Sequence, residues 1–128
     1  MTNKVVVDAS AILALINSEK GKSVVENNLD DAVLSSVNFS EVITVTSRNG
    51  FNNKEIIGLL SSIFPNIVDF DYEQSCIASS FDKIMKKQGL SLGDRACLAL
   101  AKQQNCMALT ADRAWKKLDI GVDIECIR

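Results

Sequence analysis

Short runs of apolar, often β-branched residues alternate along the chain with longer stretches of helical character. The runs of strand length are residues 4–8, 32–35, 67–70, 107–110 and 122–127. The helical stretches are residues 9–17, 21–28, 38–48, 54–64, 73–88 and 92–104, followed by a short helical turn at 113–118. Strands separated by helices favour an α/β fold in which helices cover both faces of a parallel sheet.

Chain-breaking residues support these boundaries. Gly50 follows the helix predicted at 38–48, and Pro65 breaks the chain before the next strand. Gly89 is expected to stop the long helix predicted at 73–88. No internal repeat or linker interrupts the 128 residues, so we expect one domain spanning residues 1–128.

Four acidic residues stand where such a fold places its binding sites, at the carboxyl ends of the strands. Asp8 ends the first predicted strand, and Asp112 lies just beyond the strand at 107–110. Glu41 and Asp94 open two of the predicted helices, which start at the same edge of the sheet. All four carboxylates are therefore able to face one crevice.

Helix capping is the alternative explanation for each acid. Glu41 and Asp94 stand three residues after Asn38 and Ser91, which is the spacing of a capping box. The other two acids could be simple N-caps at strand–helix turns. Capping does not exclude metal ligation. Four neighbouring carboxylates repel one another, and the helix N-termini offset only part of this repulsion, so a divalent cation would offset the rest. Oxygen ligands favour Mg²⁺, or Mn²⁺, over zinc.

The composition excludes several other kinds of chemistry. The chain contains no histidine, so a Ser-His-Asp or Cys-His nucleophile system and a histidine acid–base pair are impossible. A hydrolase of this composition would depend on carboxylates and a metal ion. The net charge of −2 neither favours nor excludes a nucleic-acid partner, because a local basic rim can coexist with an acidic total.

The cysteines and the hydropathy bear on the cellular environment. The four cysteines form no C-x-x-C pair and adjoin apolar segments, which predicts free, buried thiols in a reducing cytosol; they are Cys76, Cys97, Cys106 and Cys126. The longest apolar run, residues 11–16, is too short to cross a bilayer, and no basic segment precedes a cleavage-like site. We therefore expect a soluble, cytoplasmic protein without a membrane span.

Each of the four acids lies in a recognisable motif. The motifs are Val5-Val-Val-Asp-Ala-Ser10, the surroundings of Glu41, Ser91-Leu-Gly-Asp-Arg-Ala-Cys-Leu-Ala-Leu-Ala101 and Leu109-Thr-Ala-Asp-Arg-Ala-Trp115. Together they resemble the motifs of PIN-domain ribonucleases and, within these, the VapC-type toxins of bacterial and archaeal toxin–antitoxin pairs. The resemblance covers essentially the whole chain, and the third and fourth motifs are its most specific part. It implies a single three-layer α/β/α PIN-like domain with a mainly parallel central sheet.

The resemblance also implies roles for the site residues. Asp8 and Asp94 would be the central Mg²⁺ ligands, and Glu41 and Asp112 would complete the acidic pocket directly or through waters. All four matched acids are present, as an active site requires.

Two hydroxyl residues match supporting positions of the family. Thr110 corresponds to the hydroxyl at the strand end, which would orient water or phosphate, and Ser10 to the small polar position after the first Asp. The implied activity is that of a metal-dependent endoribonuclease, in which an activated water leaves a 5′-phosphate and a 3′-hydroxyl. The implied partners are an RNA of the tRNA or rRNA class, a VapB-like antitoxin and a second copy of the chain.

Several basic residues could contact RNA. Arg95 and Arg113 each follow a proposed site acid, so they would contact phosphate or form surface ion pairs. Five lysines are expected mainly on solvated faces, with contact to the RNA backbone as the alternative: Lys83, Lys86, Lys87, Lys116 and Lys117.

An apolar stripe follows the helix predicted at 54–64. Its members are Ile56, Leu59, Leu60 and Ile63. Core packing explains such a stripe, and the resemblance offers a second explanation, a groove that accepts an antitoxin segment. Trp115 is expected to pack against the last strand rather than to stack on a base.

Two other functions remain possible from the residues alone. A PIN-type module could bind RNA or protein without cutting it. A phosphatase of the haloacid dehalogenase type would need Asp-x-Asp after the first strand, where Ser10 stands instead, and a receiver domain would need an acidic pair beside Asp8.

Overall fold

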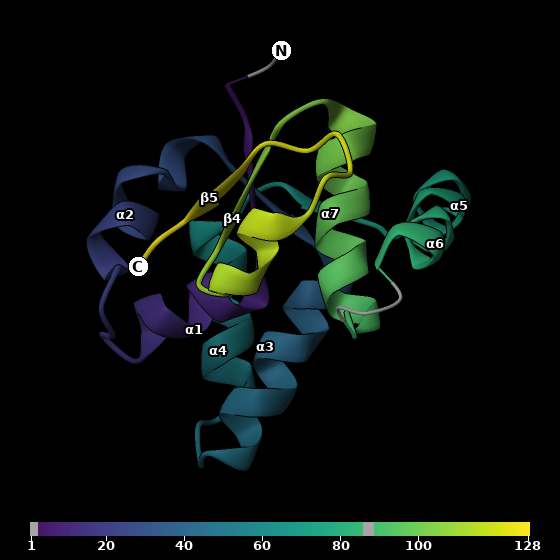
Figure 1. The fold of residues 1–128 in the computed structure, drawn as a ribbon. Coiled ribbons are helices and arrows are strands. Elements are labelled where there is room, and N and C mark those ends of the chain that lie inside the picture. The colour runs from purple at the N-terminus through teal and green to yellow at the C-terminus, as the bar shows by residue number, and fades with distance from the viewer. Residues whose placement is uncertain (1–2, 86–88) are drawn as a thin grey trace.

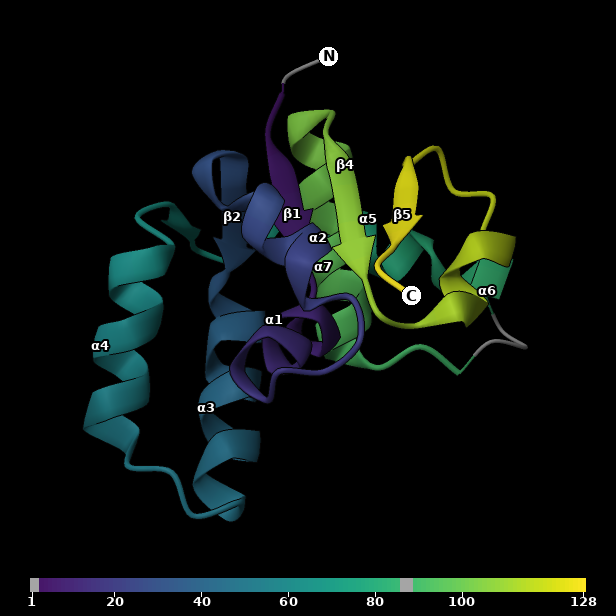
Figure 2. The same ribbon diagram turned by 90° about the vertical axis from the view of Figure 1, so that its left-hand side faces the viewer.

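A computed structural model describes residues 3–85 and 89–128 and shows a sheet between two layers of helices (Figure 1, Figure 2). The strands are β1 (Val5–Val7), β2 (Ala32–Ser35), β3 (Ile67–Val68), β4 (Met107–Thr110) and β5 (Ile124–Cys126). They lie in the order β3-β2-β1-β4-β5, and every pairing is parallel. The predicted α/β fold with a parallel sheet is confirmed.

The helices divide between the two faces of the sheet. One face is covered by α1 (Ala9–Ile16), α2 (Lys22–Asn27), α3 (Ser36–Arg48) and α4 (Asn53–Ile63), with η1 (Leu29–Asp31) before β2. The other face is covered by α5 (Tyr72–Ser80), α7 (Leu92–Gln104) and η2 (Arg113–Lys117), and α6 (Asp82–Met85) follows α5. In Figure 2, α1 and α2 lie in front of the sheet and α7 lies behind it.

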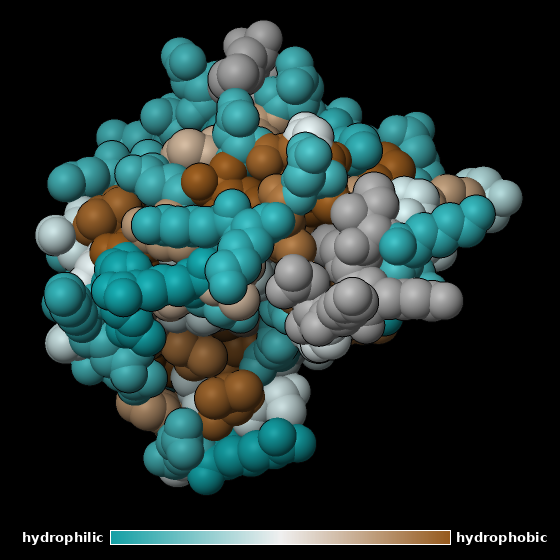
Figure 3. Space-filling model, viewed as in Figure 1, coloured by the Kyte–Doolittle hydropathy of each residue, from teal (hydrophilic) through white to brown (hydrophobic). Residues whose placement is uncertain are grey.

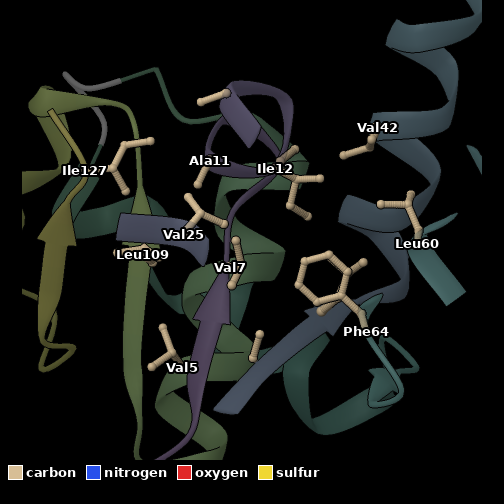
Figure 4. Close-up of a cluster of buried hydrophobic side chains, with 14 of the residues drawn as sticks. Val5, Val7, Ala11, Ile12, Val25, Val42, Leu60, Phe64, Leu109 and Ile127 are labelled. Atoms are coloured by element: carbon tan, nitrogen blue, oxygen red, sulfur yellow. The ribbon is translucent and has the colours of Figure 1, made fainter. Parts of the chain in front are cut away.

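The alternation of side chains along β1 explains why there are two cores. Successive residues of a strand point to opposite faces. Val5 and Val7 therefore pack with α1 to α4 in the cluster of Figure 4, whereas Val6 packs with α5 and α7. Both faces of β1 are covered, which is why the strand reads as a continuous apolar run.

The starts of α1, α3 and α7 meet beneath the carboxyl ends of the strands (Figure 1, Figure 2). One residue separates β1 from α1, and α3 begins directly after β2. The geometry expected for a site at this edge is therefore present.

The prediction of one long helix at 73–88 is wrong. α5 ends at Ser80, and α6 begins at Asp82 after Phe81, which is buried (1% exposed) in the core against α7. The hydroxyls of Ser79 and Ser80 donate to the carbonyls of the preceding turn, at 2.9 and 2.6 Å, which satisfies the end of α5. The predicted end of this helix, at residue 88, lies outside the described residues.

Smaller differences concern the strands, a cysteine and the aromatic residue. β3 covers two of the four predicted residues, because the amide of Phe70 donates to Ser36 Oγ instead of continuing the sheet. All four cysteines are free, as predicted, but only Cys97 and Cys106 are buried, whereas Cys76 on α5 is exposed and Cys126 is half-buried. Trp115 is fully buried beside β5, which confirms its predicted packing. In the described ranges, no helix is long and apolar enough to cross a membrane.

Candidate active site

Asp8 stands at the N-cap position of α1 without capping it. Its backbone carbonyl accepts the amides of Ala11 and Ile12, but its carboxylate accepts no backbone amide of the helix. The side chain is nonetheless buried, at 3% exposed. The capping explanation for Asp8 is therefore wrong, which leaves its carboxylate available for other interactions.

Two hydroxyls hold one oxygen of that carboxylate. Ser10 Oγ and Thr110 Oγ1 donate to Asp8 Oδ2, at 2.6 and 3.0 Å. Each hydroxyl in turn accepts a backbone amide, from Ala111 at 3.0 Å and from Asp112 at 3.1 Å. Because a hydroxyl carries a single proton, both residues are committed to orienting Asp8 rather than to donating to a substrate.

Glu41 lies in the second turn of α3 rather than in a capping box. The helix begins at Ser36, and Ser35 caps it by accepting the amide of Val37 at 3.2 Å, so the predicted cap at Asn38 is wrong. Asn38 Nδ2 instead donates to Glu41 Oε1 at 3.2 Å and to the carbonyl of Gly93 at 3.0 Å. Ser35 is therefore both the last residue of β2, as predicted, and the cap of α3.

Asp94 forms the predicted capping box at the start of α7. Ser91 Oγ accepts the amide of Asp94, and Asp94 Oδ2 accepts the amide of Ser91, both at 3.2 Å. The preceding residue, Gly93, lies against Glu41, because a Cβ built there would stand 2.6 Å from Glu41 Oε1. The start of α7 is therefore packed directly on the acid from α3.

Asp112 occupies the edge of the site. It is exposed, and its Oδ1 caps η2 by accepting the amide of Ala114 at 2.9 Å, so the capping prediction is confirmed for this residue. Its own amide donates to Thr110 Oγ1, which connects it to Asp8 through one hydroxyl.

Three of the acids share one electrostatic environment. Burial raises the pKa of Asp8 from 3.8 to about 6, and the nearby negative charges of Asp94 and Glu41 add to this, whereas the hydrogen bonds from the two hydroxyls oppose it. The pKa of Cys97, one turn along α7, is raised well above its usual range by burial and then by Asp8, Asp94 and Glu41. Asp112 contributes to neither of these pKa shifts, which agrees with its place at the edge.

Each of the four acids keeps one carboxylate oxygen free of hydrogen bonds within the described residues. The engaged oxygens are Asp8 Oδ2, Glu41 Oε1, Asp94 Oδ2 and Asp112 Oδ1. The salt bridge found among the described residues joins Arg128 to Glu19 and involves none of these acids. The cluster therefore carries negative charge that no described cationic side chain neutralises.

This donor set suits a hard cation that keeps part of its water shell. Among residues 3–85 and 89–128, no three His, Cys, Asp or Glu side chains converge closely enough to hold one metal ion by themselves. Mg²⁺ characteristically binds through one or two carboxylates and keeps several of its waters. A buried carboxylate such as Asp8, fixed by one oxygen and open at the other, fits that kind of site.

The structure describes five of the seven basic candidates. Arg95 is half-buried, and its Nε has no hydrogen-bond partner in the described chain. Arg113 is exposed and donates from Nε to the carbonyl of Arg128 at 3.1 Å. Lys83, Lys116 and Lys117 are exposed, whereas Lys86 and Lys87 lie outside the described residues.

A separate apolar groove of about 470 Å³ opens between α1, α2 and α4. Ile56, Leu59 and Ile63 line it from α4, facing Leu15 and Ile16 of α1. Figure 3 shows hydrophobic side chains exposed over α1 and α4. Leu60, the fourth residue of the predicted stripe, is 1% exposed and lies in the core of Figure 4 instead.

Sequence reasoning did not find two residues that this site uses. The spacing predicts Asn38 as a cap, and no sequence pattern assigns a role to Gly93. The Asn-x-x-Glu spacing that leads to Glu41 was the available signal, but it is shared by a capping box and by an amide that holds a carboxylate one turn later.

Comparison with known proteins identifies the family. The PIN domain family matches residues 5–121, whereas no curated protein sequence matches. Similar solved structures include a toxin–antitoxin complex from Klebsiella pneumoniae (TM-score 0.78, 15% identity, 98% of each chain covered). VapBC2 from Rickettsia felis bound to a promoter DNA fragment has a TM-score of 0.76 at 15% identity, over 94% of this chain and 96% of that one.

A third structure is the Mycobacterium tuberculosis toxin VapC20, described as cleaving the sarcin–ricin loop, with a TM-score of 0.75 at 15% identity over 94% of this chain and 99% of that one. At these identities the three structures establish a shared fold. The match of the family to residues 5–121 covers β1 to β4 and all four acids. The chain therefore belongs to the PIN domain family.

Proposed function

We propose that this protein is a Mg²⁺-dependent endoribonuclease and the toxin of a VapC-like toxin–antitoxin pair. The observation that carries the proposal is the environment of Asp8, a buried carboxylate fixed through Oδ2, open at Oδ1, and next to Glu41 and Asp94. A buried anion beside two others is unfavourable unless a cation joins them. Family membership and the fold shared with VapC toxins support the same function.

The acids would divide the work of holding the ion. Asp8 and Asp94 would hold Mg²⁺, Mn²⁺ being an alternative, and Glu41 and Asp112 would complete the pocket directly or through waters. When bound, the ion supplies charge neutralisation at the phosphodiester and lowers the pKa of a coordinated water. Ser10 and Thr110 keep the Asp8 carboxylate in one orientation through their hydrogen bonds to Oδ2.

The proposed reaction is the hydrolysis of an RNA phosphodiester bond. The water oxygen forms a bond to phosphorus while the bond between phosphorus and the 3′ oxygen breaks, which leaves a 5′-phosphate and a 3′-hydroxyl. One proton of the water is released, and the leaving oxygen takes one up. The basic residues Arg95 and Arg113 stand next to the site acids in sequence and would contact the RNA backbone.

Replacing Asp94 by Asn should remove most of the metal-dependent cleavage of a structured RNA mixture. Asn keeps an oxygen that can accept the amide of Ser91, so the capping box and the fold should be retained while the charge is lost. We expect a decrease of roughly 10²-fold or more in rate at fixed Mg²⁺, measured by gel analysis of RNA fragments.

Chelation of divalent ions provides the matched control. It should abolish cleavage by the wild-type protein, and added Mg²⁺ or Mn²⁺ should restore it. Equal cleavage by the wild type and by Asp94→Asn, with or without chelator, would contradict a metal nuclease. No cleavage by either protein, together with intact RNA binding, would favour a non-catalytic PIN module.

We further propose that the groove between α1, α2 and α4 binds the antitoxin. It is apolar, open and distinct from the acidic site, and the exposed Leu59 (43%) and Phe51 (43%) line it. Lys22 and Glu26 at its border offer charges of both signs to a partner. Such a surface suits the apolar face of an amphipathic helix, and VapBC complexes are among the structures with this fold.

Leu59→Glu should prevent complex formation with the antitoxin while RNA cleavage is unaffected. A charge in the apolar groove has no partner, so we expect at least a tenfold loss of affinity. Ile57→Glu is the matched control, because Ile57 is equally exposed (41%) on α4 and is absent from the groove lining. The measurement is co-purification with a candidate VapB-like antitoxin, together with relief of growth arrest by that antitoxin.

Equal loss of binding in both α4 variants would contradict this placement of the antitoxin. Size measurement of the same samples also tests the predicted homodimer.

A further inference from the structure

Asn38 connects two elements of the acidic site from within the protein. It is fully buried (0% exposed) near the start of α3. Its amide nitrogen reaches Glu41 Oε1 on the same helix and the carbonyl of Gly93 on α7, at 3.2 and 3.0 Å. Since an amide NH₂ has two protons, both are used in holding these two groups.

Gly93 forms the second side of this arrangement. A Cβ at this position would lie 2.6 Å from Glu41 Oε1 and 3.0 Å from both Oε2 and Cδ. Because residue 93 has no side chain, the Glu41 carboxylate can lie against the backbone of α7 at the residue that precedes Asp94. Gly93 does not have a positive φ, so the need for glycine here comes from this close approach and not from the backbone conformation.

The other atom of the Asn38 amide indicates that stability alone does not explain the residue. Asn38 Oδ1 is buried and has no hydrogen-bond partner in the part of the chain that the structure describes. A buried acceptor without a partner opposes folding. An apolar side chain would avoid this loss, but it could not hold Glu41.

We propose that Asn38 and Gly93 position the Glu41 carboxylate against the start of α7, so that Glu41 and Asp94 are held in register for one divalent cation. This inference rests on the proposed function, which assigns the ion to these acids. Asn38 is a positioning residue that acts through Glu41. Gly93 contributes only the space that the carboxylate occupies.

The test compares Asn38→Ala with Gln74→Ala. Gln74 is a matched control, because it is also fully buried and donates twice from its amide, to the Asp69 carbonyl and Gln103 Oε1. Its own oxygen likewise has no partner among the described residues. None of its hydrogen bonds reaches a site acid. We expect both variants to unfold at lower temperature.

Only Asn38→Ala should weaken Mn²⁺ binding to the metal-free protein, by roughly 10–100-fold in calorimetry, as is usual when a residue supporting a ligand is removed. For RNA cleavage, kcat should fall at fixed Mg²⁺ while KM changes little, because no RNA contact is removed. The Mg²⁺ concentration for half-maximal activity should rise by a similar factor.

Gly93→Ala approaches the same carboxylate by another route and keeps the inference testable if Asn38→Ala fails to fold. The new methyl group displaces the flexible end of Glu41 without removing any polar group. Gly58→Ala in α4 is its control, since a Cβ there meets nothing within 4 Å. We expect weaker Mn²⁺ binding for Gly93→Ala and unchanged binding for Gly58→Ala.

Three results would overturn this inference. If Asn38→Ala and Gly93→Ala bind Mn²⁺ and cleave RNA like an active wild type, the positioning role fails and the proposed function stands. If Gln74→Ala weakens Mn²⁺ binding as much as Asn38→Ala does, the effect is general destabilisation. If the wild type neither binds Mn²⁺ nor cleaves RNA, the proposed function fails and takes this inference with it.

Discussion

Asp8→Asn should reduce RNA cleavage by roughly 10³-fold or more while the protein remains folded. The substitution removes the charge of a proposed central ligand, and loss of metal-dependent transition-state stabilisation is worth several kcal/mol. The amide oxygen of Asn can still accept the protons of Ser10 and Thr110, so the packing around β1 should be unchanged. Initial rates on a structured RNA mixture at saturating Mg²⁺ provide the measurement.

Growth arrest on expression should be lost in parallel. Ser10→Ala is a useful comparison, because it removes one of two hydrogen bonds to Asp8 and leaves the charge, so a smaller loss of rate is expected. A folded Asp8→Asn protein that still cleaves RNA at the wild-type rate would exclude this mechanism.

The metal-free protein should lose about 3 kcal/mol of stability through Asp8 as the pH rises from below 3.8 to above about 6. Below pH 3.8 the carboxyl group is protonated in both the unfolded and the folded chain, so it contributes nothing. Between 3.8 and the folded-state pKa of about 6, the unfolded chain releases the proton first and is favoured. Above both values the difference is constant, at 1.36 kcal/mol for each pKa unit between them.

Asp8→Asn isolates this effect from all other titrating groups. The variant should be more stable than the metal-free wild type near about pH 7.5 by most of that amount, and nearly equal to it near about pH 4. Denaturant unfolding at both pH values measures the difference. Mg²⁺ should stabilise the wild type and not the variant, because binding to the folded state adds to its stability. A difference that does not change with pH would show that Asp8 is not held in an unfavourable ionised state.

Local patterns were sufficient for much of the fold. The predicted bounds of 32–35, 92–104 and 107–110 agree with β2, α7 and β4, because short apolar strands and a capped helix are defined by neighbouring residues. The helix predicted at 73–88 failed because Phe81 is buried against α7, a contact between residues distant in the sequence. Periodicity alone contains no information about that contact.

The caps show the same distinction at the level of single residues. The capping box of Ser91 and Asp94 could be predicted, since both partners belong to one turn. Asn38 at the same spacing before Glu41 is no cap, because the cap of α3 is Ser35, three residues earlier. A shift of one turn changes the role of an amide from capping a helix to holding a carboxylate.

The sequence by itself determined which chemistry is available: four acids at strand ends and helix starts, no histidine, and an alternation of elements that brings those acids to one edge of a parallel sheet. Only the tertiary structure decided how each acid is used. Asp8 is oriented by Thr110, from 102 residues further along the chain, and Glu41 is held against Gly93 on another helix. Hydrogen bonds and close approaches of this kind depend on distances between elements, and these are set by the packing of the two cores on the sheet.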